Sequence, residues 1–162
     1  MTGCVVCGVD DSEHARNAAR LAARLSKWLD LRLVLVHAAK AASPFAAIAP
    51  LAPAYGPEPA MPDEPSGSAG QLLLRRIEAQ EGIDGAELRA EVGDPAELII
   101  AMAEEEGADL IVVGSRRRSV LSSLFLGSVS ATVAARAPCP IVIVPEGAHV
   151  RSPWATEDAS AP

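Results

Sequence analysis

Short runs of aliphatic residues alternate with helical segments along most of this chain, and that alternation limits the possible folds more than any other feature. Four runs are apolar enough for strands buried on both faces, at 4–9, 31–38, 109–113 and 141–144, and a fifth at 87–92 alternates like a half-exposed edge strand. Because a helical segment separates each strand from the next, the connections are crossovers and the strands are parallel. We predict an α/β fold, an open five-stranded parallel sheet of the Rossmann-like kind with helices on both faces.

The helices are predicted from apolar spacing and from residues that start helices. The third has the clearest start, with Asp94 as N-cap, Pro95 in the first turn and Glu97 completing a capping box, and it runs to about residue 107. The other three are expected after Asp10-Asp11-Ser12, at 71–79 and at roughly 128–136. In the helix predicted after Ser12, apolar residues recur at three- and four-residue spacing: Ala18, Leu21, Ala22, Leu25 and Leu29.

The segment 39–65 differs in composition from the rest of the chain. It contains seven of the 13 prolines, a density that excludes both a helix interior and a central strand. We predict a long Pro/Ala-rich loop within one domain that spans residues 1–146, followed by a flexible polar tail at 147–162.

Composition and charge exclude several classes of function. The net charge of −7 repels a phosphate backbone, so general nucleic-acid binding is not expected. The chain has neither a basic N-terminal region nor an apolar run of about 18 residues, so no membrane partner is expected and we predict a cytoplasmic protein. With aromatic residues at only 3%, the core must be aliphatic.

The three cysteines do not indicate a metal or redox site. Cys4 and Cys7 are three residues apart on a predicted strand, so their side chains point to opposite faces and cannot share a metal or a disulfide. Cys139, between two prolines, is interpreted as a small core residue.

Ligands of open parallel sheets bind beyond the carboxyl ends of the strands, and two of those ends are chemically suggestive here. Asp10 follows the first strand, and the segment from Gly114 leads through three arginines (116–118) to Gly127 and Ser128. Free N–H groups at the following helix start would bind phosphate. Two structural alternatives stay open. In one, Asp10 only caps the first helix. In the other, Gly127 is only a turn, Ser128 is an N-cap and the arginines form a solvated face.

The histidines and serines give no sign of a catalytic site. His14 is expected to be exposed on the first helix, and His37 to be a hydrogen-bonded core histidine at the end of a buried strand. No serine has an evident base and no acid pair stands out, so a dedicated hydrolytic site is not expected.

Several segments, in this order, resemble the universal stress protein family. They are VVCGVDDSEH at 5–14, LVHA at 35–38, Gly-Asp-Pro at 93–95, DLIVVGSR at 109–116, LGSVS at 126–130 and APCPIVIV at 137–144. The resemblance covers roughly residues 3–145. It implies the strand order 3-2-1-4-5, a homodimer paired through the last strand at 141–144, and, in one branch of the family, ATP bound between the first and fourth strands.

The ATP-binding branch carries a glycine, two residues, a second glycine, nine residues, then glycine and Ser/Thr. This chain has Gly114, Arg117 in place of the second glycine, and then Gly127-Ser128 at the correct spacing. If that position needs positive φ or close approach to a phosphate, the arginine would block it. Otherwise Arg116 or Arg117 would contact the phosphate through its side chain.

The resemblance also implies roles for individual residues. Asp10 would accept hydrogen bonds from the ribose hydroxyls, and the backbones of Val9 and Ala38 would meet the adenine. The phosphates would be surrounded by Gly114, Arg116, Gly127, Ser128, Val129 and Ser130. The expected function is a nucleotide-binding stress-response regulator acting as a homodimer, and the alternative is a member of the non-binding branch that works through protein contacts alone. A third hypothesis is a slow ATPase, since related α/β folds support such chemistry, but no enzymatic activity beyond weak ATP hydrolysis is expected.

Overall fold

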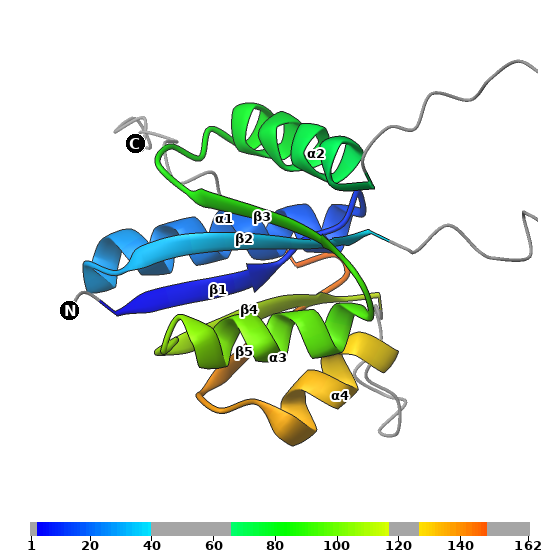
Figure 1. The fold of residues 1–162 in the computed structure, drawn as a ribbon. Coiled ribbons are helices and arrows are strands. Elements are labelled where there is room, and N and C mark those ends of the chain that lie inside the picture. The colour runs from blue at the N-terminus through cyan, green and yellow to red at the C-terminus, as the bar shows by residue number, and fades with distance from the viewer. Residues whose placement is uncertain (1–2, 40–65, 117–126, 149–162) are drawn as a thin grey trace, which may run out of the picture.

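The computed structural model describes residues 3–39, 66–116 and 127–148, and it contains the alternating strands and helices that the sequence predicts. The elements are β1 (Cys4–Gly8), α1 (Glu13–Leu29), β2 (Arg32–Ala39), α2 (Ser66–Glu81), β3 (Glu87–Val92), α3 (Pro95–Glu105), β4 (Leu110–Ser115), α4 (Ser128–Arg136) and β5 (Ile141–Pro145). All strand pairs are parallel and the order is β3-β2-β1-β4-β5, which confirms the predicted sheet (Figure 1).

The helices cover both faces of the sheet, with α1 and α2 on one side and α3 and α4 on the other (Figure 1). Buried side chains of α1 and α2, including Ala18, Leu74 and Ile77, pack on one face. Side chains of α3 and α4, including Ile99 and Val133, pack on the other. The two cores are almost entirely aliphatic, as the low aromatic content predicts.

The cysteines take the places that strand geometry predicts. Cys4 packs in the core under α3 and α4, whereas Cys7 packs in the core under α1 and α2. The two thiols therefore lie on opposite faces of β1, and all three cysteines are free. Burial raises the pKa of the Cys7 thiol, which keeps it protonated and unreactive. Cys139 is half-buried against the same core as Cys4.

Some helix boundaries and contacts differ from the predictions. Helix α2 begins at Ser66, before the predicted start at 71. The prediction missed its first residues because they are polar and carry no apolar periodicity. Leu29, expected on the apolar stripe of α1, is 55% exposed because the helix ends there. Asp94 caps α3 as predicted, but both carboxylate oxygens of Glu97 contact Arg136 on α4, so the capping box is wrong.

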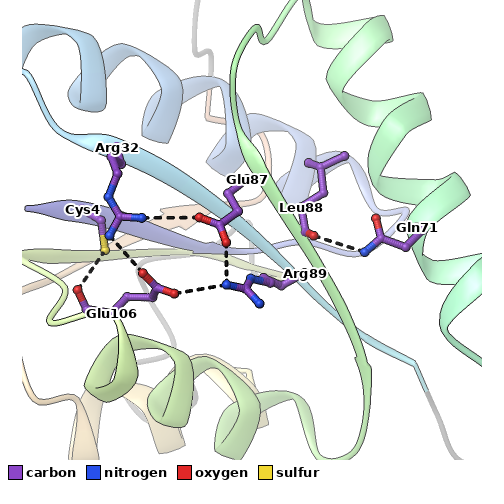
Figure 2. Close-up of polar contacts among 7 residues, drawn as sticks. All are labelled: Cys4, Arg32, Gln71, Glu87, Leu88, Arg89 and Glu106. Carbon is purple, nitrogen blue, oxygen red and sulfur yellow. Dashed lines mark hydrogen bonds and ion pairs between the residues drawn. The ribbon is translucent and has the colours of Figure 1, made fainter.

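Four charged side chains form a closed ring at the amino ends of β2 and β3 (Figure 2). Arg32 lies 2.9 Å from Glu106 and 3.4 Å from Glu87, and Arg89 lies 2.5 Å from Glu87 and 3.4 Å from Glu106. Each carboxylate thus bridges two guanidinium groups. The ring ties β2 and the edge strand β3 to the end of α3, since Glu106 is the C-cap of that helix.

Two predicted features fall largely outside the described residues, namely the loop at 39–65 and the tail at 147–162. Among the residues that are described, no helix is both long and apolar enough to cross a membrane.

Candidate functional site

A pocket of about 580 Å³ opens at the carboxyl ends of β1, β2 and β4, where the strand order reverses. Its volume lies within the range of sites that hold cofactor-sized molecules. Nine of the ten predicted site residues line it: Val9, Asp10, Ala38, Gly114, Arg116, Gly127, Ser128, Val129 and Ser130. The tenth, Arg117, lies outside the described residues.

Asp10 is held in place by Ser12. The backbone N–H of Ser12 donates to Oδ1 of Asp10 at 2.9 Å, and the Ser12 hydroxyl donates to the same oxygen. Burial disfavours the charged carboxylate, but these two hydrogen bonds, with the charges of His14 and Arg116, lower the pKa of Asp10 below its ordinary value. Asp10 is therefore an ionised acceptor at neutral pH, and Ser12, not Asp10, is the N-cap of α1.

The second carboxylate oxygen of Asp10 is turned toward Arg116. Its Oδ2 atom lies 4.0 Å from Nη2 of Arg116, beyond hydrogen-bond length, and the two side chains are 48% and 78% exposed. The exposed Arg116 guanidinium can therefore turn toward a ligand in the pocket, while Ser12 holds the Asp10 carboxylate.

The N-terminus of α4 provides hydrogen-bond donors on the opposite side. The first intrahelical bond of α4 runs from the N–H of Ala131 to the Gly127 carbonyl, and the N-cap Gly127 has no side chain to cap the helix. The N–H groups of Ser128, Val129 and Ser130 therefore precede the helical ladder and can receive an anion. The Ser130 hydroxyl is less available, because it donates to the Gly127 carbonyl at 3.0 Å.

The apolar part of the pocket lies around Val9 and Ala38. The N–H of Val9 donates to the Val36 carbonyl at 2.8 Å, and the Val9 carbonyl accepts from Nδ1 of His37 at 2.9 Å. His37 is hydrogen-bonded, as predicted, but it is half-buried and lines the pocket rather than the core. With the Val9 N–H already paired, the Ala38 backbone is the better candidate for contacting an adenine edge.

His14 is buried, so the prediction that it is exposed is wrong. Its side chain lines the pocket, and its Nε2 atom lies 2.9 Å from the Ser12 hydroxyl. The cause is close packing of α1 on β4: a Cβ at Gly114 would lie 2.7 Å from both Cδ2 and the carbonyl oxygen of His14. Gly114 is thus a glycine because the helix approaches the strand backbone there.

Sequence reasoning missed the pocket residues that come from α3. Pro95 and Ile99 line the wall opposite α1. Pro95 was predicted only as part of a helix start and Ile99 was not singled out, because nothing local shows that α3 borders the site. Within the described ranges there is no group of three His, Cys, Asp or Glu side chains that could hold a metal ion.

Comparisons with known proteins agree with this fold. Residues 1–145 match the model of the Universal stress protein family. A universal stress protein of Thermus aquaticus, named for the QAH/OAS sulfhydrylase 3′ region, is 34% identical over 150 residues, covering 86% of this chain and 96% of its own. Universal stress protein YxiE of Bacillus subtilis is 31% identical over 150 residues, covering 86% of this chain and 97% of its own.

A solved structure points the same way. A universal stress protein crystallised in complex with cAMP superposes with a TM-score of 0.59 at 26% identity, and the match covers 92% of this chain and 98% of that one. Matches of this extent, in sequence and in fold, leave one conclusion. The chain belongs to the universal stress protein family.

Proposed function

We propose that this protein is a stress-response regulator that binds an adenine nucleotide, ATP or a related molecule, in the pocket at the carboxyl ends of β1 and β4. The observation that carries the proposal is that nine of the residues to which the family resemblance assigns a role line that one pocket. The relative solved with cAMP supports it, because that protein holds an adenine nucleotide on the same fold.

The polar groups are arranged as a nucleotide requires. Asp10 offers the pocket an ionised acceptor, which suits the hydroxyls of a ribose. The start of α4 and Arg116 offer N–H donors and positive charge, which suit phosphate. Between them, the wall around Val36, Ala38 and Ile99 is apolar enough for a base.

The test is nucleotide affinity in the parent protein and in Asp10→Ala. Calorimetric titration with ATP, AMP and cAMP should show binding in the parent that weakens roughly tenfold to a hundredfold in the variant, since a charge-assisted hydrogen bond is worth about 1.5 to 3 kcal/mol. Mass spectrometry of nucleotide released from denatured protein identifies the natural ligand. Equal affinity in both proteins refutes the Asp10 assignment, and no binding at millimolar nucleotide assigns the protein to the branch that works through protein contacts.

Arg117 decides which of two routes such a site uses. If its guanidinium binds phosphate, Arg117→Gly should keep nucleotide binding but make it less sensitive to salt. If its side chain blocks the site instead, Arg117→Gly should create binding that the parent lacks. Affinity measured at low and high salt separates the two outcomes.

The proposal includes a homodimer formed through β5. In the sheet order β5 has β4 on one side and no described strand on the other, and its residues Ile141, Val142 and Ile143 are only half-buried. An aliphatic edge of this kind is prone to pair with another chain, and symmetric pairing of two copies satisfies it.

The ladder between β4 and β5 suggests how to test the dimer. The Pro140 carbonyl accepts from the N–H of Ile111, and the N–H of Glu146 donates to the Ser115 carbonyl. The backbone groups of even-numbered residues of β5 therefore face β4, and the N–H of Ile143 faces outward. Ile143→Pro should therefore yield a monomer, whereas Ile143→Ala, which shortens the side chain but keeps the N–H, should stay dimeric. Light scattering at micromolar concentration decides, and a monomeric parent near 16.8 kDa contradicts the proposal.

A further inference from the structure

The Ser12 hydroxyl joins two side chains that line the pocket. It lies within hydrogen-bond distance of Oδ1 of Asp10 and 2.9 Å from Nε2 of His14, and it accepts the N–H of Ala15 at 3.3 Å. A hydroxyl has one proton to donate and two lone pairs that accept. Three partners fill the hydrogen-bonding capacity of the Ser12 hydroxyl. What each partner can donate or accept therefore decides where the hydrogen of each bond lies.

An ionised carboxylate accepts hydrogen bonds and cannot donate them. The proton of the Ser12 hydroxyl must therefore lie between its oxygen and Oδ1 of Asp10, because two oxygen atoms within hydrogen-bond distance would repel each other without a proton between them. His14 then has to donate from Nε2. The arrangement selects the imidazole form that carries hydrogen on Nε2.

We propose that His14 is a positioning residue for the pocket: through Ser12 it holds the carboxylate of Asp10 in the orientation that binds ribose. This inference rests on the proposed function for its ligand. It assigns a role to a buried polar side chain that the nucleotide itself need not touch.

The surroundings of His14 keep its ring in that position. The ring is 9% exposed, and its Cδ2 edge packs against the backbone of Gly114 so closely that a Cβ there would lie 2.7 Å away. The Asp10 oxygen that receives the two Ser12 hydrogen bonds is thereby fixed, and the other oxygen is directed toward Arg116 and the pocket.

The first test needs no ligand. Nitrogen-15 NMR of the imidazole in the nucleotide-free protein should show that Nε2 of His14 carries a hydrogen. An Nε2 atom without a hydrogen would overturn the proposal. Because the measurement is made without nucleotide, it judges His14 even if the parent protein binds no nucleotide.

The second test uses a matched pair of variants. Glutamine places an N–H donor near the position of Nε2, and methionine has a similar shape without a donor. His14→Gln should bind ATP within about twofold of the parent, and His14→Met about threefold to tenfold more weakly, the range expected for one net hydrogen bond. His14→Met should also lose preference for ATP over 2′,3′-dideoxy-ATP, because a misplaced Asp10 no longer recognises the hydroxyls.

Two controls separate positioning from general damage to the fold. In an Asp10→Ala background the Gln and Met variants should bind ATP equally, because the residue through which His14 acts is gone. In ligand-free protein the carboxyl pKa of Asp10 should be higher in His14→Met than in His14→Gln. If the two variants match in both affinity and Asp10 titration, or still differ without Asp10, the positioning role is refuted.

Discussion

At the amino ends of β2 and β3 two arginines and two glutamates close into a ring, whereas at the carboxyl ends of β1 and β4 an aspartate and an arginine stand 4.0 Å apart. The two clusters use the same kinds of side chain. In the ring each charge contacts two opposite charges, and the Glu106 side chain is only 13% exposed. At the other end Asp10 and Arg116 are far more exposed, and each keeps polar atoms directed at the pocket.

This difference separates charges that join elements from charges placed for a ligand. A network in which each charge contacts two opposite charges restrains the elements it connects and leaves little charge for another molecule. A carboxylate with one oxygen fixed and the other directed into a cavity is preorganised for a partner. Local charge density would not distinguish the two ends, but the hydrogen-bond pattern does.

The largest effect is expected from Gly114→Ala, at the carboxyl end. The new Cβ would meet the carbonyl and ring of His14 at 2.7 Å, and backbone atoms cannot move aside as a flexible side chain can. We expect a loss of about 1 to 3 kcal/mol in unfolding free energy, together with weaker nucleotide binding. Urea denaturation measures the first quantity and calorimetry the second.

Gly127→Ala is the matched control for that substitution. Among the described residues, a Cβ at Gly127 would meet only the Ser130 hydroxyl oxygen, at an ordinary 3.6 Å, and the backbone φ of −55° suits any residue. Stability should stay within about 0.5 kcal/mol of the parent. If Gly114→Ala proves as stable as Gly127→Ala, the close packing of α1 on β4 is not a constraint.

A smaller effect is expected from Glu106→Gln, at the amino end. The change removes a charge that faces both Arg32 and Arg89, and it leaves two like charges near each other. The Tm should fall by a few degrees and the loss should shrink in high salt, while nucleotide affinity stays unchanged. Glu105→Gln, at the exposed neighbouring position, should leave the Tm unchanged. An altered affinity in Glu106→Gln would show that the two ends are coupled.

The fold was predictable because its signals are local. A strand buried on both faces must be a short apolar run, and a helix covering such a sheet must have an apolar stripe, so the alternation alone indicates the architecture. The strand order and the roles of individual site residues came from the resemblance to a family. The pocket then gathers those residues where the carboxyl ends of the strands meet.

What the sequence could not reveal depends on residues distant along the chain. His14 was predicted to be exposed because its local sequence gives no sign of burial. Its burial is caused by packing against Gly114, one hundred positions later. Nothing in the local sequence pairs Arg32 with Glu106, since only the folded sheet brings them within 2.9 Å. Glu97 fitted a local capping box but binds Arg136 on another helix. In each case the outcome depends on a contact between residues that are distant along the chain.

The smallest effect concerns what Asp10 contributes to folding. Burial opposes its ionisation, but the hydrogen bonds from Ser12 outweigh that cost and lower its pKa in the folded state. A group with a lowered folded pKa stabilises the protein above its unfolded pKa, about 3.9 for aspartate, and loses that contribution as the pH falls through the folded value.

Asp10→Asn has no such charge to lose. The difference in unfolding free energy between parent and variant should therefore be constant from neutral pH to about pH 5 and shrink at lower pH, by less than about 1 kcal/mol because solvent screens a half-exposed carboxylate. Urea denaturation at a series of pH values measures the difference. A difference that grows as the pH falls would mean that the folded pKa of Asp10 is raised. A charge that contributes so little to folding, while its removal costs tenfold or more in nucleotide affinity, would be placed there for the ligand.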